Sequence, residues 1–143
     1  MPVSDDPSTV DRRIAIAGTV EAARAAWYAD PFFVPAADQP DVLARLHAIV
    51  DDYSGWHWLH GYDSVRPDPP ALDRLAEVRV PTLVVIGGRD VPDFQRIADS
   101  LVEGIAGARK AVIRGVGHMA NMEAPGEVNR VLAGFLASAD GGP

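Results

Sequence analysis

Two apolar segments of the same form, one after the other, most constrain how this chain can fold. Residues 81–90 read PTLVVIGGRD and residues 110–118 read KAVIRGVGH, so each apolar run reaches glycine before a polar side chain. Between them, apolar residues from Phe94 to Ile105 follow the spacing of an amphipathic helix. A strand, a helix and a strand within about 40 residues form a βαβ unit with parallel strands. Both strands therefore end at the same edge of the sheet.

The polar residues that follow these strands suit a shared site. Asp90 comes three residues after Gly87, and His118 comes three residues after Gly115. Ligands of parallel α/β sheets bind beyond the carboxyl ends of the strands, and neighbouring strands lie only about 4.8 Å apart. We therefore expect Asp90 to contact His118. A carboxylate in that position fixes the imidazole tautomer and stabilises the imidazolium that forms when histidine takes a proton from a nucleophile.

This order of residues resembles that of the α/β hydrolases, whose triad runs Ser, Asp or Glu, then His. The segment PTLVVIGGRDVPDF is similar to the family's penultimate strand and acid turn, and GVGHMANMEAP is similar to its last strand exit and histidine loop. The resemblance covers residues 81–137 well and residues 20–80 more loosely, as a helical cap. It implies Asp90 and His118 as catalytic acid and base, with no metal and no organic cofactor.

The fold class implied is α/β, an incomplete α/β-hydrolase fold in which a helical cap precedes a βαβα unit with two parallel strands. Thr19 is a suitable N-cap for a cap helix over residues 20–29. A second cap helix begins at Pro40, and its apolar spacing can continue as far as His60. The expected parts are a tail or linker at 1–18, the cap at 19–78, the C-terminal βαβα part of the core at 79–139 and a tail at 140–143.

The nucleophile elbow of the family, GxSxG on a strand-to-helix turn, is absent from these 143 residues. Ser54 and Ser64 precede Asp90 in the required order, but neither lies on such a turn. We therefore expect a second polypeptide to supply the serine, or the chain to derive from a larger parent. A second copy of the chain lacks the elbow too. The serines are Ser4, Ser8, Ser54, Ser64, Ser100 and Ser138, and none has glycine both two residues before and two residues after it.

The strand expected at residues 82–86 is also typical of a protein that binds another chain. It is apolar without alternation, as in parallel strands that are covered on both faces. Two strands rarely make a stable sheet alone, and an unpaired edge favours the addition of another strand. We expect a partner chain at this edge, or self-association through strand edges.

The substrate-binding residues expected are Trp56, Trp58 and Met119. The two tryptophans belong to the aromatic segment WHWLH, for which packing of a cap helix is the favoured alternative. Met119 follows the histidine, and core packing explains it as well as pocket lining does. His57 and His60 are three residues apart in that segment. They lack a third ligand at a convincing spacing, so we expect no metal site.

Two further carboxylates near the expected site have alternative interpretations. Asp93 is a second candidate for the acid, but Asp90 matches the family motif better. Glu123 precedes Pro125 at the start of the last apolar helix pattern. We expect Glu123 to place negative charge at the N-terminus of that helix, where the helix dipole favours it, rather than to act in catalysis.

Composition excludes several classes of function. A net charge of −7 argues against nucleic-acid binding, which needs clustered Lys and Arg. No apolar run is long enough to span a membrane, the first residues do not resemble a secretory signal, and there are no cysteines for disulfides. A cytoplasmic location is the resulting expectation.

The function expected is therefore that of the C-terminal part of an α/β hydrolase. It would supply the acid and histidine of a Ser-Asp-His triad that hydrolyses a small-molecule carboxylic ester, lactone or related carbonyl compound, with the serine on another chain or lost. Without a serine-bearing half, we expect this chain to be inactive. The alternative is a non-catalytic interaction or ligand-binding protein that keeps the hydrolase shape. A fragment without an independent role is a third interpretation.

Overall fold

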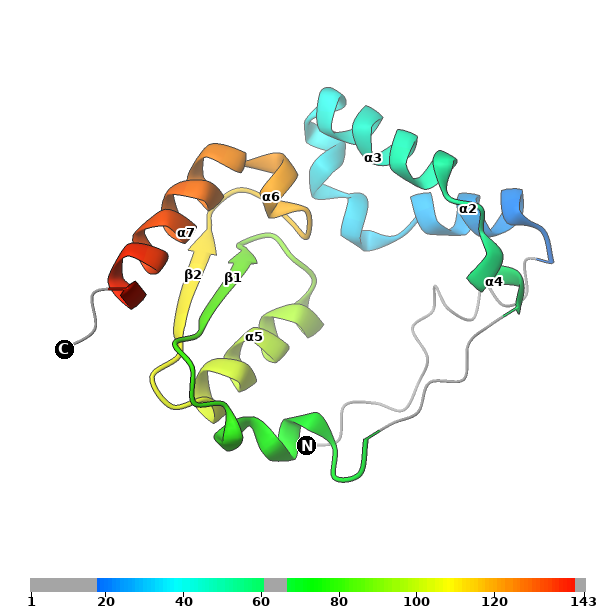
Figure 1. Cartoon of the computed structure of the whole chain (residues 1–143). Helices are drawn as coiled ribbons and strands as arrows, with labels where there is room; N and C mark the ends of the chain where they lie inside the picture. The colour runs from blue at the N-terminus through cyan, green and yellow to red at the C-terminus, as the bar shows by residue number, and fades with distance from the viewer. Residues whose placement is uncertain (1–17, 61–66, 141–143) are drawn as a thin grey trace.

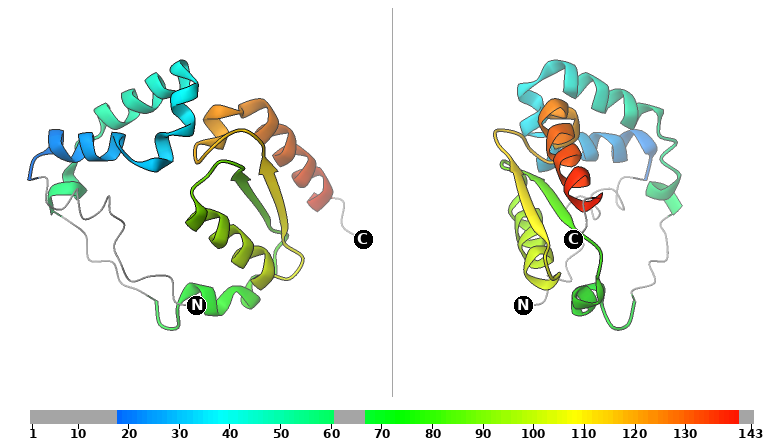
Figure 2. Two further views of the ribbon diagram at one scale, coloured as in Figure 1. Left: turned by 180° about the vertical axis from the view of Figure 1, so that it is seen from behind. Right: turned by 60° about the vertical axis from the view of Figure 1, so that its left-hand side comes forward.

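The computed structural model describes residues 18–60 and 67–140. Two parallel strands, β1 (Leu83–Gly87) and β2 (Arg109–Ile113), lie between helices α5 (Pro92–Gly104) and α7 (Pro125–Asp140) (Figure 1 and Figure 2). Their register runs from Leu83 beside Arg109 to Gly87 beside Ile113. The predicted βαβ unit is confirmed. The expectations for the N-terminal tail before Gly18, for Ser64 and for residues 141–143 lie outside the described residues.

Side chains of β2 connect the sheet to both flanking helices. Ile113, only 1% exposed, packs with buried residues of the following loop and of α7. The guanidinium of Arg109 lies 5.0 Å from the centre of the Phe135 ring and donates a 2.8 Å hydrogen bond to Ser138 Oγ, so it holds α7. Lys110 Nζ lies 2.6 Å from Asp99 Oδ1 of α5. The strand is thus fixed between two helices although its sheet has only two strands.

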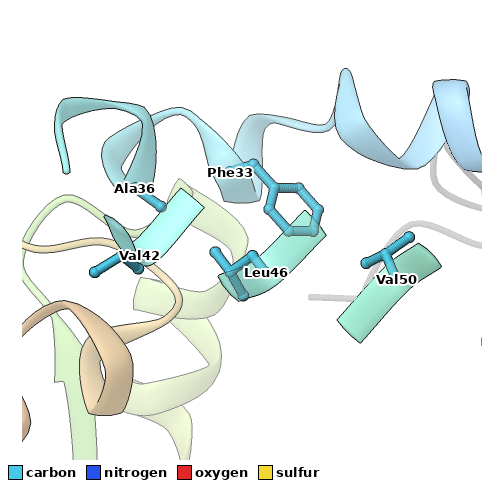
Figure 3. Packing of buried hydrophobic residues seen from close by; sticks show 5 residues of the cluster. All are labelled: Phe33, Ala36, Val42, Leu46 and Val50. Atoms are coloured by element: carbon cyan, nitrogen blue, oxygen red, sulfur yellow. The ribbon is translucent and has the colours of Figure 1, made fainter. Parts of the chain in front are cut away.

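The first half of the chain forms a separate helical layer at the carboxyl ends of the strands (Figure 1). Its elements are α2 (Val20–Tyr28), the 3-10 turns η1 (Pro31–Phe33) and η2 (Pro35–Asp38), and α3 (Pro40–Asp52). As predicted, Thr19 caps α2, since its hydroxyl accepts a 3.2 Å hydrogen bond from the Ala22 N–H. The buried cluster of this layer, seen in Figure 3, comprises Phe33, Ala36, Val42, Leu46 and Val50.

The expectation that the second cap helix continues to His60 is wrong. Helix α3 ends at Asp52, Tyr53 is extended, and α4 (Trp56–His60) is a separate short helix. Gly55 lies between them with φ +72°, a conformation that interrupts a right-handed helix and that glycine adopts without strain. A Cβ at Gly55 would also come within 2.8 Å of Val20. The apolar spacing continues across this break, so it could not reveal it.

Two short elements complete the fold. The segment before β1 forms a 3-10 helix, η3 (Ala71–Glu77). A one-turn helix, α6 (Ala120–Glu123), follows the second strand exit and was not foreseen. In the part of the chain that the structure describes, no helix is long and apolar enough to cross a membrane.

Polar side chains of α2 join it to the C-terminal end of α3. Arg24 donates hydrogen bonds to carbonyl oxygens at that end, at 3.3 Å to Val50 and 3.0 Å to Asp51, which satisfies groups left unpaired where a helix stops. The hydroxyl of Tyr28 lies 2.6 Å from Asp51 Oδ1. Partial burial and this hydrogen bond raise the pKa of Tyr28 to about 12.

We expect the cap to lose stability at alkaline pH through Tyr28. Because its folded pKa lies above the ordinary value of 10.0, the stabilisation is complete below pH 10 and is lost as the pH rises towards about 12. An ultraviolet titration of tyrosinate should show one late transition near pH 12, absent from Tyr28→Phe and retained in the control Tyr53→Phe. Titration of every tyrosine near its ordinary pKa would contradict this expectation.

Candidate active site

The exits of the two strands are held together by backbone hydrogen bonds. The Gly88 N–H donates to the Ile113 carbonyl at 2.7 Å, and the Arg89 N–H donates to the Val116 carbonyl at 2.8 Å. The Asp90 N–H then donates to the Gly87 carbonyl at 3.2 Å, which closes the turn after β1. These bonds extend the pairing of the strands beyond the sheet and bring the two loops side by side.

Asp90 and His118 form the contact that their positions predict. His118 Nδ1 lies 3.1 Å from Asp90 Oδ1 and 3.0 Å from Oδ2. A carboxylate only accepts, so Nδ1 carries the proton and Nε2 is the basic nitrogen of the neutral ring. The Asp90 side chain is 5% exposed and that of His118 is 28% exposed. Asp90 Oδ1 also accepts a 2.8 Å hydrogen bond from the Val91 N–H, which fixes the carboxylate.

Two phenylalanines from different layers cover the His118 ring. Phe32 of η1 stacks on it with ring centres 4.8 Å apart, and Phe94 of α5 packs against it at 4.4 Å. The two phenylalanine rings also meet each other edge to face at 5.4 Å. Apolar surroundings strengthen the hydrogen bond to Asp90 because they lower the local dielectric constant.

Glu123 lies on the other side of the histidine loop. Its side chain is buried and accepts hydrogen bonds from the N–H groups of Gly117, at 2.9 Å, and Met119, at 3.1 Å. The carboxylate therefore binds the residues on both sides of His118. Both oxygens face the loop, so Glu123 binds the loop backbone, and its expected charge effect on the last helix stays a prediction.

Close backbone approaches require glycine at both strand exits. A Cβ on Gly87 would overlap the Gly117 carbonyl oxygen, and a Cβ on Gly117 would overlap the Pro35 ring of the cap. The cap also reaches the turn after β1 through an ion pair of 2.6 Å between Arg89 and Asp38. The histidine loop is thus confined between the first strand exit and the cap.

A cavity of about 790 Å³ opens in the cap beside the histidine loop. Trp58 and Met119, two of the predicted binding residues, line it. Trp56 is not among its lining residues, and its ring stacks on His60 at 4.6 Å, so its role in binding stays a prediction. The lining is mainly apolar and comprises Trp27, Phe33, Leu46, Ile49, Val50, Asp52, Tyr53, Ser54, Trp58, Met119 and Met122.

The other candidates of the sequence occupy different surroundings. Asp93 is exposed and pairs with Arg96 on the surface of α5, whereas Asp90 binds the histidine. Ser54 is exposed, lines the cavity and lies in the loop between α3 and α4 rather than after a strand. His57 Nδ1 lies 2.7 Å from the Tyr53 hydroxyl. Among residues 18–60 and 67–140, no three His, Cys, Asp or Glu side chains cluster as a metal site would require.

Sequence reasoning missed the cap's contribution to the site. Phe32 contacts His118 from 86 positions earlier in the chain, and no local pattern marks such a contact. Phe94 was visible only as part of an apolar helix stripe. The position of Glu123, a few residues after His118, could have predicted its contact. A carboxylate there can fold back and accept hydrogen bonds from the N–H groups of the histidine loop.

Solved structures of known proteins agree with this architecture, whereas no family model and no curated protein matches the chain. MenH from S. aureus matches in structure with a TM-score of 0.76 at 22% identity, over 92% of this chain and 51% of that chain. Est816, described as an N-acyl homoserine lactone degrading enzyme, matches with a TM-score of 0.68 at 25% identity, over 91% and 52%.

The chain therefore spans about half the length of these two α/β-hydrolase proteins. Its cap, two parallel strands and flanking helices form an incomplete α/β-hydrolase fold. The resemblance seen in the sequence is confirmed at the level of the fold.

We expect Gly87→Ala to disrupt the acid and histidine pair, because its methyl group would displace the Gly117 backbone. Gly88→Ala is the matched control, since a Cβ there meets its nearest atoms only at 3.4 Å. Thermal unfolding should show a loss of about 1–3 kcal/mol for Gly87→Ala, the range for forced overpacking, and nuclear Overhauser contacts between residues 90 and 118 should weaken. Equal stability of the two variants would contradict the close approach.

Proposed function

We propose that this chain supplies the acid and the base of a Ser-Asp-His triad, with the serine and the oxyanion hole on another polypeptide or on a further part of a longer protein. The observation that carries the proposal is the hydrogen bond of 3.0 Å between His118 Nδ1 and the nearly buried Asp90 carboxylate. That geometry leaves Nε2 free to act as a base, which is what a serine nucleophile requires. The incomplete hydrolase fold agrees with this role.

In the proposed reaction, His118 Nε2 takes the serine proton as the serine oxygen attacks a carbonyl carbon. Asp90 stabilises the imidazolium, which then protonates the departing alcohol oxygen and leaves an acyl-serine. Water activated by His118 attacks the acyl group, and the proton returns to the serine. The acid product leaves and the triad is restored.

The proposed substrates are small carboxylic esters, lactones or related carbonyl compounds with an apolar part. The apolar cavity in the cap supports this choice, because Met119 lines it and directly follows His118, the proposed base, in the chain. The structural likeness to Est816, which degrades N-acyl lactones according to its description, supports a lactone as one member of the class. A cytoplasmic location is part of the same proposal.

The decisive experiment labels the serine. The protein is purified from its native host, treated with a fluorophosphonate probe, and intact masses are measured. We expect label on a second polypeptide that copurifies, or on a longer form of this chain. Asp90→Asn should slow labelling by roughly 10⁴-fold and His118→Ala by roughly 10⁶-fold, as in other serine triads.

Asp93→Asn is the matched control, because it removes a nearby exposed carboxylate that pairs only with Arg96 in the described structure. It should label at the rate of the unmodified protein. A solitary chain without label, or a labelled serine whose rate ignores Asp90, would contradict the proposal.

A second candidate function is non-catalytic binding of an apolar ligand. The cavity favours it, since its mainly apolar lining would bury an apolar ligand and binding there needs no serine. Such a protein would keep the hydrolase shape and bind a ligand or partner in the cap.

We expect the apolar dye N-phenyl-1-naphthylamine to bind in this cavity and to fluoresce. Ile49→Asp puts a charge at the exposed edge of the lining and should weaken binding about tenfold, because the bound dye would cover the carboxylate and remove part of its water. Val34→Asp is the control, because Val34 is 62% exposed, close to the 61% of Ile49, and does not line the cavity. Equal weakening by both variants would show that the dye binds elsewhere.

A further inference from the structure

The histidine loop is closed by one side chain. Helix α6 is a single turn, and the Glu123 N–H at its end donates to the Met119 carbonyl at 2.9 Å. The Glu123 carboxylate accepts in turn from the Met119 N–H at 3.1 Å, so the two residues bond each other in both directions. The other oxygen reaches past His118 to the Gly117 N–H at 2.9 Å.

This arrangement restrains the backbone on both sides of His118. Hydrogen bonds to an ionised acceptor are shorter and stronger than neutral ones, and this carboxylate belongs to a residue only 7% exposed. Gly117 has no side chain to limit its own torsion angles, so the loop depends there on contacts from other residues. Gly87 and Pro35 pack against Gly117, and the Glu123 carboxylate adds a hydrogen bond that restrains the direction in which the His118 ring leaves the backbone.

We infer that Glu123 is a positioning residue for His118, which acts through the loop and not on the substrate. Asp90 holds the ring at Nδ1, while Glu123 holds the backbone from which the ring projects. The inference rests on the proposed function, in which His118 is the base. In an active complex, its loss should lower kcat more than it raises KM, because the base loses its alignment whereas the cavity loses only a backbone bond at one lining residue, Met119.

The test uses nitrogen-15-labelled full-length chain, without any nucleophile partner. Long-range proton–nitrogen correlation spectra report the His118 tautomer, and hydrogen exchange reports the N–H groups of Gly117 and Met119. In Glu123→Gln, an amide NH2 group replaces one carboxylate oxygen. A donor then faces the N–H of Gly117 or of Met119, and the negative charge that strengthened both hydrogen bonds is lost. We expect both amides to exchange about tenfold to hundredfold faster and the fraction of ring with the proton on Nδ1 to fall.

Two further variants test whether the length of the Glu123 side chain matters as well as its charge, and whether the effect is specific to Glu123. Glu123→Asp keeps the charge but is one methylene shorter, so it should lose at least one of the two bonds and resemble Glu123→Gln. Glu103→Gln changes an exposed glutamate of α5 and should leave both measurements unchanged. If Glu123→Gln speeds amide exchange while the His118 tautomer stays as in the parent chain, the role is structural only and the inference is overturned.

Measurements on the parent chain alone can contradict the inference. A further variant, Asp90→Asn, separates its failure from the failure of the proposed function. If the Gly117 and Met119 amides of the parent chain exchange as fast as unprotected loop amides, the carboxylate does not hold them. In Asp90→Asn, the tautomer should shift although Glu123 is intact. An unchanged His118 spectrum in Asp90→Asn would contradict the acid and base pair itself, whereas a shift there but none in Glu123→Gln overturns only the role of Glu123.

Discussion

The close approach of the two strand exits is the constraint on which the site depends. A Cβ on Gly87 would overlap the Gly117 carbonyl oxygen, so there is no room for a side chain at that point. Only at that separation can the turn amides after β1 donate to the carbonyls of the next loop, and only then does the short side chain of Asp90 reach the His118 ring. Parallel pairing brings the strands together, but the absence of a side chain at Gly87 decides how close their loops come.

The sequence predicted this pair because its signals are local. Each apolar run, its glycine and the polar residue three positions later lie within ten residues, and the crossover rule for βαβ units joins the two segments. Contacts from the cap have no such signal. Phe32 stacks on His118 because the whole cap packs over the strand ends, a fact of tertiary structure. The break between α3 and α4 was missed since apolar spacing continues through Gly55, whose positive φ is a property of the backbone.

The cap and the strand ends meet at the histidine loop, so the cavity in the cap and the contact of Asp90 with His118 share one loop. Pro35 packs on Gly117, and the cavity in the cap includes Met119, the residue after His118. A displacement of the cap would change the cavity wall and the stacking on His118 together. Substrate selection in the proposed enzyme would therefore depend on residues that also hold the base in place.

The incomplete burial of apolar side chains on β1 and α7 supports the proposal of a partner for this chain. Strands of parallel sheets are normally covered on both faces, yet Leu83, Val84 and Val85 are only half buried. Leu132 and Leu136 of α7 are 40% and 59% exposed. A polypeptide that added a strand beside β1 would cover apolar surface and, in the proposed enzyme, bring the serine to His118. The contact between Asp90 and His118 needs no added serine, because the pairing of β1 with β2 and the close approach at Gly87 already bring the two side chains together.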